Sequence, residues 1–449
     1  MKVLFFLCFA SLIFANSSIR LDEAIQILKE DNLEIKAARL NVKSAQAEVD
    51  TVSGSHWGKL DFIQDFVTSD DAGNVFGFKL TSREATFGDF GFSEFDMTNP
   101  DVLSVKAKAL NYPDSRNFFK SKLKYEIPLF TGFKISSYED VMNSMVRIKN
   151  LKKDVIINEK VYELKKSFYD MALLRKSTKL LTTILNNINT LEKTTQSMID
   201  VGYAKKVDLL EVKAKKGNIE RLIHSMQSNQ KLLYHYISFL LNQKVTNITT
   251  PSLEVAMPMI NDEDILNINL DIKQARKGLE IRKSMINASK SSYYPMLGAF
   301  GEISTADDTF LGDANDHSSY TVGARLTWNI FNGGIDKSNI EKSRIEHLKT
   351  KNQVQLARTG IALKIQKIRT QIQTYDQDIE SLQKELTLAN EIYKNYEARY
   401  KEKLSSMSDV IIKQSGQIQK ILELQLAHNK RNERIFALEK IANGENNAK

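Results

Sequence analysis

The chain has 449 residues, of which 26% are charged, and a net charge of +8 at pH 7. Beyond residue 15 no apolar run reaches the roughly 18 residues of a membrane-spanning helix, so we expect no such helix in the rest of the chain. The basic residues alternate with acidic ones and do not form one basic face, which argues against nucleic-acid binding.

Residues 1–15 are predicted to be a secretory signal peptide. Lys2 provides a short basic start, an apolar run follows, and the small residue Ala15 precedes polar residues. The alternative is an N-terminal membrane anchor, but the run is too short to span a bilayer comfortably. Cys8, the one cysteine of the chain, lies within this run. The mature chain would therefore hold no disulfide and no Cys-based metal site.

The rest of the sequence repeats itself. Three pairs of segments correspond: 32–39 with 269–276, 128–132 with 329–333, and 202–208 with 403–409. In the first pair (NLEIKAAR and NLDIKQAR) six of eight residues are identical, and the members of the other two pairs lie 201 positions apart. Two similar halves predict a pseudo-symmetric assembly, in which neither half forms a complete, closed fold by itself.

We therefore divide the mature chain into two structural repeats. The first covers 16–241 and the second 263–442, with a linker at 242–262 between them and a polar tail at 443–449. Each repeat is predicted to contain a helix, two strands, a long helix and a return helix. The predicted helices cover about 21–52, 133–201 and 207–241 in the first repeat, and about 263–291, 335–401 and a return helix to about 441 in the second.

The two long helices are the most distinctive predicted elements. Residues 133–201 contain neither Gly nor Pro, and at about 1.5 Å per residue such a helix is roughly 100 Å long. In the second long helix an apolar seam alternates steps of four and three residues: Ile361, Ile365, Ile368, Ile372, Tyr375, Ile379, Leu382, Leu386, Ala389, Tyr393, Tyr396 and Tyr400. This 3.5-residue period is typical of left-handed supercoiling against other helices. The length argues against an ordinary compact bundle.

Between the helices, four segments alternate apolar and polar residues, two segments in each repeat. They lie at about 59–66, 122–129, 297–303 and 320–330. Each has about ten residues, the length that a tilted strand needs to cross a bilayer. The residues predicted to face a polar lumen include Lys122, Lys124, Glu126 and Arg325. The alternative is a half-buried sheet in a soluble protein, but aromatic residues near the segment ends suit a membrane interface.

Four strands per chain have a consequence for assembly. A sheet in a bilayer must close, because open edges leave backbone groups unpaired in hydrocarbon. The smallest common transmembrane barrels have about eight strands, so the chain must share one barrel with other copies. Two copies would supply eight strands and three would supply twelve. The predicted fold class is thus mainly α with membrane β: a long coiled-coil α-barrel plus four transmembrane strands per chain.

The two loops between paired strands differ in length and charge. The first is longer by about 36 residues, the difference between the two repeat shifts (237 − 201). The second, residues 307–316, is short and acidic. Divalent-cation binding there is one interpretation, but a solvated hairpin loop is favoured because the carboxylates lack the spacing of a dedicated cation loop.

Sequence motifs for catalysis or cofactor binding are not apparent. The six histidines lie in unrelated contexts without metal-ligand spacing. The sequence shows no phosphate-binding glycine loop and no nucleophile elbow. We therefore predict that the protein is not an enzyme and has no cofactor, catalytic site or metal site.

The order of elements resembles the TolC-type outer-membrane efflux family (outer membrane factors) over essentially the whole mature chain. The best local matches are Pro128–Gly132, its counterpart Ile330–Gly334, and Val201–Leu210. The resemblance implies a homotrimer with a twelve-strand outer-membrane barrel, a long periplasmic α-barrel, and an equatorial belt built from the linker and the termini. It also implies a passive, porin-like exit duct in outer-membrane lipid, driven by an inner-membrane efflux pump through a periplasmic adaptor (membrane fusion) protein.

The family closes its periplasmic end at the helix tips, and the resemblance assigns residues to this gate. Asp208 matches a residue that links the tips, Asp409 a gate carboxylate, and Tyr400 a tyrosine that makes a linking hydrogen bond. Glu211, one turn after Asp208, could supply a further acid. The adaptor-docking tips are Val201, Gly202, Tyr203, Lys403, Leu404 and Ser405. The alternative interpretation makes these acids ordinary residues of helix starts, and it is compatible with gating.

The chain departs from the family pattern at three tip positions. Ser405 stands where the best-studied type has an arginine, Ile412 where it has a second carboxylate, and Lys403 where it has a glycine. An arginine–carboxylate lock is therefore not expected, and Lys205 or Lys206 is the alternative cation.

Two other functions compete with an efflux duct. The same fold could serve as the exit duct of a type I protein secretion system. A periplasmic coiled-coil adaptor or tether without a barrel is a further alternative. It predicts that the chain is found in the soluble fraction, without extraction by detergent.

Overall fold

The computed structural model describes residues 18–252 and 255–443. The predicted signal peptide with Cys8 lies outside the described residues, as does most of the predicted tail. The chain divides into two compact units. The sheet unit contains Ser44–Val146 and Gly278–Thr350, and the helical unit contains the segments before, between and after them.

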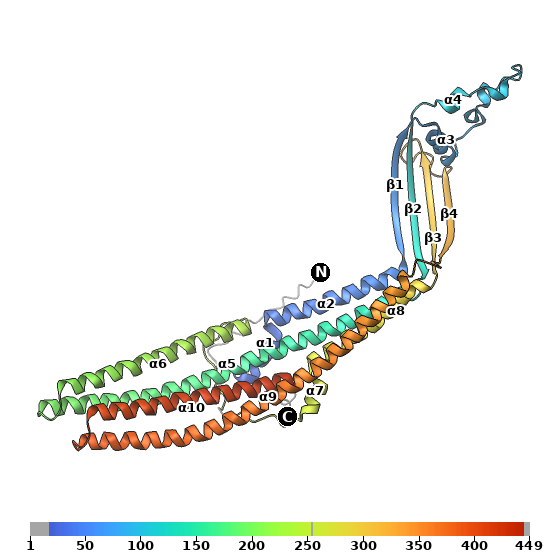
Figure 1. Cartoon of the computed structure of the whole chain (residues 1–449). Coiled ribbons are helices and arrows are strands. Elements are labelled where there is room, and N and C mark those ends of the chain that lie inside the picture. Colours follow the sequence, from blue (N-terminus) through green and yellow to red (C-terminus); the bar gives the residue numbers. More distant parts are fainter. Residues whose placement is uncertain (1–17, 253–254, 444–449) are drawn as a thin grey trace, which may run out of the picture. The chain divides into compact units, whose positions relative to one another are not determined.

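The sheet unit is built on four antiparallel strands in the order β1-β2-β3-β4 (Figure 1). Their bounds are β1 Lys59–Ser69, β2 Arg116–Phe130, β3 Met296–Asp307 and β4 Ser318–Thr327. Each repeat therefore contributes one strand pair, and β2 pairs with β3 across the repeats. Among the described residues, the outer edges of β1 and β4 have no strand partner.

The strand register separates the sheet into a polar and an apolar face, as the alternation predicted. Lys124 lies opposite Asp61 and Glu302, and Glu302 opposite Thr321, so these residues share the polar face. The apolar face is exposed in this chain at 44–81% for its large side chains: Leu60, Phe62, Phe66, Leu123, Ile303, Tyr320, Val322 and Leu326. A sheet with this exposed face and two open edges needs an apolar environment or further strands.

The two loops at one end of the sheet differ as their lengths predicted. The first, between β1 and β2, contains short helices: α3 Ala72–Thr81, η2 Phe87–Phe90, η3 Phe92–Glu94, η4 Val102–Ser104 and α4 Lys108–Asn111. It exposes several large apolar side chains, among them Phe87, Met97 and Leu103. The second, between β3 and β4, has no helix.

At the other end of the sheet, the repeated motif at 128–132 makes a close approach possible. Gly132 has a φ of +62°, and a Cβ there would lie 2.7 Å from the carbonyl oxygen of Ser291. Only glycine fits, because the left-handed conformation and the nearby backbone both exclude a side chain. This turn joins β2 to the following helix, and Ser291 belongs to the 3-10 helix η5 (Ser291–Tyr293) that precedes β3.

The long helices follow the predicted boundaries closely. Both α5 and α9 have 67 residues, and α6 and α10 return from them (Figure 1). Their bounds are α5 Lys134–Asp200, α6 Lys206–Leu241, α9 Ile335–Lys401 and α10 Met407–Ile441. No described helix combines the length and apolar character needed to cross a membrane.

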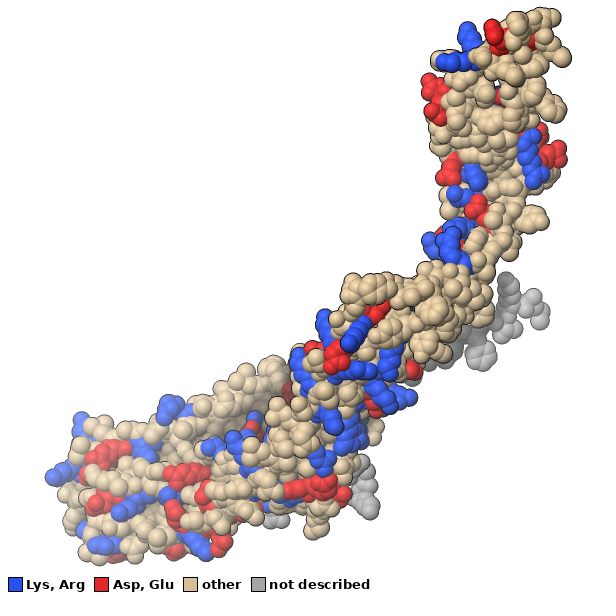
Figure 2. All heavy atoms as spheres, turned by 45° about the vertical axis from the view of Figure 1, so that its right-hand side comes forward, with Lys and Arg blue, Asp and Glu red and all other residues tan. Residues whose placement is uncertain are grey.

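The predicted seam of α9 points into the helical unit. Its most buried members are Ile365, Ile368, Ile372, Ile379, Tyr393 and Tyr400. Near the tips, α5, α6, α9 and α10 pack around one apolar core that includes Leu181, Val212, Tyr393 and Val410. On the face shown in Figure 2, basic and acidic residues are interspersed over the helical unit, in keeping with the mixed charge of the sequence.

The helices predicted at 21–52 and 263–291 are each broken, so their prediction as single helices was wrong. Asn32 separates α1 (Leu21–Asp31) from α2 (Leu33–Gly54), and Asn269 separates α7 (Asp262–Ile268) from α8 (Leu270–Lys290). Each side-chain oxygen accepts hydrogen bonds from the first turn of the following helix. Each amide also donates to a carbonyl at the end of a return helix, of Leu240 for Asn32 and of Ile441 for Asn269.

These two asparagines explain the best-preserved repeat in the sequence. The motif begins with the residue that stops one helix, caps the next and fastens the return helix. In the described part of the linker between the repeats, Ile248 pairs with Ile19 in a parallel bridge.

Candidate functional site at the helix tips

The first tip joins α5 to α6 through a tight turn. The N–H of Gly202 donates to Ile199 O at 2.9 Å, and the N–H of Tyr203 donates to Met198 O at 2.8 Å. This pair of bonds is the Schellman arrangement, which requires a left-handed residue at the Gly202 position. Gly202 supplies it with a φ of +78°.

The second tip, between α9 and α10, has the same backbone with different side chains. The N–H of Lys403 donates to Tyr400 O at 2.9 Å, and the N–H of Leu404 donates to Arg399 O at 2.7 Å. Lys403 occupies the left-handed position with a φ of +65°. A non-glycine residue there costs about 1–2 kcal/mol, because its Cβ crowds the backbone.

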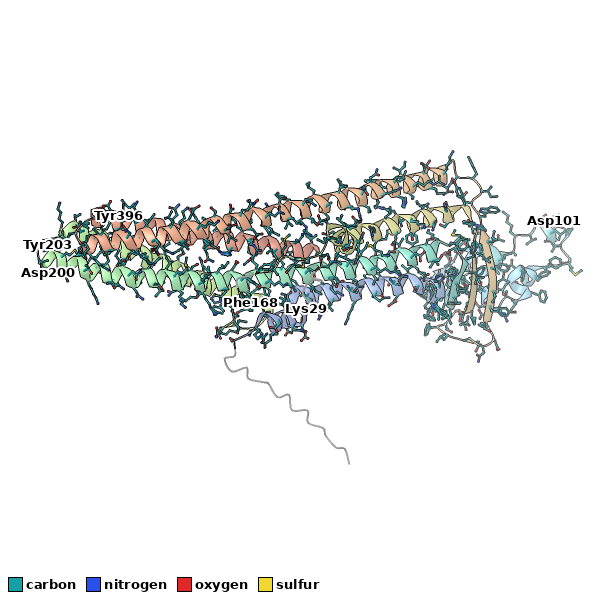
Figure 3. The ribbon with its side chains drawn as sticks, turned by 90° about the horizontal axis from the view of Figure 1, so that it is seen from below. Lys29, Asp101, Phe168, Asp200, Tyr203 and Tyr396 are labelled. Atoms are coloured by element: carbon teal, nitrogen blue, oxygen red, sulfur yellow. The ribbon has the colours of Figure 1, made fainter. Side chains whose placement is uncertain are left out.

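Two side-chain contacts join the tips within the chain. The ammonium of Lys403 lies 3.3 Å from the centroid of the Tyr203 ring, a cation–π contact between the turns. The hydroxyls of Tyr400 and Thr195 lie 3.4 Å apart and join α9 to α5. Burial raises the pKa of Tyr400, so the phenol stays protonated and can donate this bond. Figure 3 shows Asp200, Tyr203 and Tyr396 together at this end of the helical unit.

Two of the three predicted gate carboxylates, Asp208 and Asp409, are used at helix starts. Asp208 accepts a hydrogen bond from the N–H of Lys205 at 2.7 Å. Asp409 accepts from the hydroxyl of Ser406 at 2.6 Å and from its N–H at 3.2 Å, and these bonds lower the pKa of Asp409. Both acids favour the positive end of the helix dipole.

Glu211 has a different role from the two capping acids. It accepts hydrogen bonds from the hydroxyl of Ser408 at 2.9 and 2.8 Å, and so connects the second turn of α6 to the first turn of α10. One turn further on, Lys215 donates to Ser415 at 2.6 Å and makes a second link between these helices. Sequence reasoning missed Ser408, Ser415 and Thr195, because partners on separate helices share no spacing along the chain.

Lys205 and Lys206 are the predicted alternatives to the arginine of the lock. No ion pair joins Lys205 or Lys206 to the acids named above in the described part of the structure, and Ser405 donates to the backbone carbonyl of Tyr396 at 3.2 Å. The remaining tip side chains are available for contact with another molecule. Val201, Tyr203 and Leu404 are 65–67% exposed.

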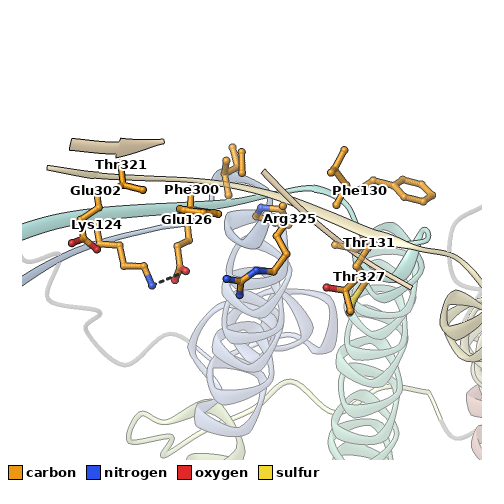
Figure 4. Close-up of a pocket in the computed structure, with 15 residues that line it drawn as sticks. Lys124, Glu126, Phe130, Thr131, Phe300, Glu302, Thr321, Arg325 and Thr327 are labelled. Carbon is orange, nitrogen blue, oxygen red and sulfur yellow. Dashed lines mark ion pairs between the residues drawn. The ribbon is translucent and has the colours of Figure 1, made fainter. Parts of the chain in front are cut away.

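The predicted lumen residues lie together on the polar face of the sheet. Lys124 pairs with Glu126 at 2.8 Å, and Lys122 pairs with Asp65 at 3.2 Å. The guanidinium of Arg325 lies over the ring of Phe300, 5.8 Å from its centroid. Figure 4 shows Lys124, Glu126 and Arg325 projecting from the same side of the sheet, where they line an open hollow.

Comparison with known proteins shows what the chain is similar to. Residues 263–444 match the family described as outer membrane efflux protein. This match covers the second repeat of the chain. No curated protein matches its sequence.

The fold of the chain also matches solved structures of membrane proteins. It is similar to CusC, with 13% identity and a TM-score of 0.77, over 96% of this chain and 95% of that chain. It is similar to a membrane protein from Pseudomonas aeruginosa, with 12% identity and a TM-score of 0.77, over 94% and 92%. It is also similar to the outer membrane protein VceC from Vibrio cholerae, with 12% identity and a TM-score of 0.74, over 94% and 96%.

Together these findings confirm the predicted family resemblance and the predicted fold class. The family match covers the second repeat, and the fold match extends over both. Members of this family are outer-membrane efflux channels, so the prediction that the protein is not an enzyme is confirmed.

Proposed function

We propose that the protein is the outer-membrane exit duct of a tripartite efflux system. In this proposal three copies share one twelve-strand barrel and continue as an α-barrel in the periplasm. The duct is passive, and an inner-membrane pump drives small molecules through it by way of a periplasmic adaptor. The observation that carries the proposal is the four-stranded sheet with two open edges and an exposed apolar face.

The two faces of β4 provide the test of this proposal. Val322 is 78% exposed and lies mid-strand on the apolar face, whereas its neighbour Thr321 lies opposite Glu302 on the polar face. An arginine on the lipid face of the mid-membrane region costs about 2–4 kcal/mol, whereas a lumen position is wet. Val322→Arg should therefore abolish the trimer and its outer-membrane abundance, and Thr321→Arg should leave both near the wild-type level.

The measurements are the mass of the detergent-purified particle and drug susceptibility in a host without its own exit duct. Wild type and Thr321→Arg should restore resistance, and Val322→Arg should not. A folded, monodisperse monomer of the wild type would contradict the shared barrel. Equal behaviour of the two variants would contradict the assignment of the faces. Loss of an exported protein instead of drug resistance would favour the secretion-system alternative.

The same proposal places the gate and the adaptor-docking surface at the tips. Three copies of Asp208, Glu211 and Asp409 near a constriction would form an acidic collar, which favours cations over anions. Single-channel recordings test this collar: Asp409→Asn should weaken cation selectivity and block by multivalent cations. Unchanged selectivity and block would leave Asp409 as a capping residue alone.

The proposal that the adaptor docks at the tips is supported by the exposed side chains of the turns, which do not pack into a core. Gly202→Lys should abolish drug resistance at normal outer-membrane abundance. The matched control is Gly217→Lys, because Gly217 is an exposed glycine within α6 and away from the turn. Normal resistance of the Gly202 variant would contradict the docking assignment.

A further inference from the structure

At the loop end of the sheet, three side chains with metal-ligand chemistry converge from separate segments. Glu84 follows α3 in the first loop, Asp307 is the last residue of β3, and His317 directly precedes β4 (Figure 1). One ligand atom from each lies within 4.8 Å of the others. The sequence could not predict this cluster, because Glu84 is more than two hundred positions from the other two.

The spacing of the two closest atoms matches that of a tetrahedral metal site. The Oδ2 of Asp307 and the Nδ1 of His317 lie 3.4 Å apart. Two ligand atoms that are each about 2.1 Å from a tetrahedral Zn²⁺ are separated by roughly 3.4 Å, because the angle at the ion is close to 109°. Both atoms can therefore bind one ion without rearrangement of the strand ends.

The burial of the imidazole is a second, independent indication of a ligand. The Nδ1 of His317 is covered by the protein and has no hydrogen-bond partner among the described residues. Its contact with Asp307 lacks hydrogen-bond geometry. A covered nitrogen without a partner is unfavourable, because it has lost water and gained no bond in exchange. A metal ion would satisfy this atom.

Backbone groups hold the Asp307 carboxylate in place. Its Oδ2 accepts from the N–H of Asp313 at 2.7 Å, and its Oδ1 accepts from the N–H of Asp308 at 2.6 Å. The N–H of His317 donates to the carbonyl of Asp313 at 3.0 Å, which fixes the short loop. Such outer contacts orient ligands before an ion arrives. Asp307 is only 8% exposed.

Arg116 modulates the cluster through its charge. Its guanidinium bonds to Glu84 and lies 3.9 Å from Asp308. Without a metal ion, its positive charge offsets the negative charges of Glu84 and Asp308. When a metal ion is present, Arg116 competes with it for the Glu84 carboxylate. Metal binding by all three side chains therefore requires Glu84 to exchange Arg116 for the ion. A variant of Arg116 can test this competition.

We propose that Glu84, Asp307 and His317 bind one divalent transition-metal ion, with Zn²⁺ as the representative. One imidazole and two carboxylates suit a borderline ion, whereas Mg²⁺ and Ca²⁺ prefer oxygen ligands alone. The bound ion would fasten the long first loop to the short second loop and so connect the outer ends of the two repeats. The proposal does not depend on the proposed transport function.

Zinc binding to the detergent-purified full-length protein tests the site directly. Calorimetric titration with ZnCl₂ should give one ion per chain, and MgCl₂ should give no comparable heat. His317→Ala and Glu84→Gln should each weaken zinc binding by about tenfold or more. Glu84 is the second variant because it lies in a loop outside the strands, and glutamine keeps an oxygen that can accept from Arg116.

Two further variants separate ligation from general effects on structure. Arg116→Gln should strengthen zinc binding, since it removes the cation that competes for Glu84. His56→Ala is the matched control: His56 lies 3.3 Å from the carboxylate of Glu139 but belongs to no three-ligand group in the described structure, and its loss should leave zinc binding unchanged.

Cobalt gives a spectroscopic check of the geometry. Co²⁺ bound to the wild type should show the intense visible absorption of a four-coordinate ion, and His317→Ala should lose it. Absence of zinc binding by the wild type, equal zinc binding by His317→Ala, or a six-coordinate cobalt spectrum would each overturn the proposal.

Discussion

The first tip places Gly202 and the second places Lys403 at the same left-handed position, with φ values of +78° and +65°. The two Schellman hydrogen bonds of one turn are equivalent, residue for residue, to those of the other. Lys403 bears a backbone cost of about 1–2 kcal/mol that Gly202 avoids. Its contact with the Tyr203 ring returns about 0.5–1 kcal/mol at an exposed site. The repeat has thus preserved the turn while its side chains changed.

The helices that follow the two turns also differ at their first residues, but here the second tip has the more favourable residue. In the second tip, Ser406 caps α10, accepting from the N–H of Asp409 at 3.1 Å. In the first tip, Lys205 occupies the capping position of α6 and makes no side-chain capping bond. One tip is therefore better adapted at its left-handed position and the other at its helix start. Four predictions test this difference by hydrogen exchange of tip peptides in the purified full-length protein.

The largest effect is expected at Gly202. Gly202→Ala should destabilise the first tip by about 1–2 kcal/mol, because alanine is strained at positive φ. Gly217→Ala should instead stabilise α6 by up to about 1 kcal/mol, because alanine is favoured within a helix. Neither added Cβ would meet another atom within 4 Å, so the difference isolates the backbone conformation. Effects of the same sign would contradict this explanation.

The next effect concerns the helix caps. Ser406→Ala should destabilise the start of α10 by about 1 kcal/mol, because the N–H of Asp409 loses its partner. Lys205→Ala should change little, since no side-chain bond is lost. Lys205→Ser should stabilise the start of α6. Equal protection in Lys205→Ser and the wild type would show that this start is not limited by its cap.

A smaller effect is expected from the contact between the turns. Lys403→Ala keeps the left-handed strain and removes the cation, so the tips should lose about 0.5–1 kcal/mol. A double-mutant cycle with Tyr203→Leu should return a coupling energy of the same size. Coupling indistinguishable from zero would mean that the ammonium and the ring do not stabilise each other.

The smallest effect is a dependence of the second tip on pH. The hydroxyl and N–H of Ser406 lower the pKa of Asp409 below its ordinary value of 3.8. The stabilisation by this carboxylate is therefore complete above that ordinary value and is lost as the pH falls through the lower folded pKa. After correction for intrinsic exchange, protection at the start of α10 should fall in acid. Asp409→Asn should abolish this change, and persistence of the full change would assign it to other groups.

Local pattern was sufficient to predict most of the fold. Alternation placed Leu123 and Lys124 on opposite faces of the sheet, and the 3.5-residue seam correctly placed Ile365 and Tyr393 inside the helical unit. Periodicity predicted no break at Asn32 or Asn269, because an apolar pattern can continue across a capped junction. The break depends on a return helix more than 150 residues away, whose terminal carbonyl accepts the amide.

The candidate site was predicted less completely than the fold. The positions of the tips follow from Gly202 and from the end of each uninterrupted helix. The partners of Tyr400 and Glu211 depend on which helices lie side by side, and no spacing along the chain reveals this. Resemblance to the family assigned acids to a gate, while the structure uses Asp208 and Asp409 to cap helices.

The sequence by itself determined the duplication, the long supercoiled helices, the two-faced strands and the need for more strands than one chain supplies. These properties follow from periodicity and from backbone hydrogen bonding, which depend on neighbours along the chain. Only the tertiary structure decided that Lys403 meets Tyr203 and that Glu84 meets Asp307 and His317. Such contacts join segments far apart in sequence, and their existence depends on how the elements pack.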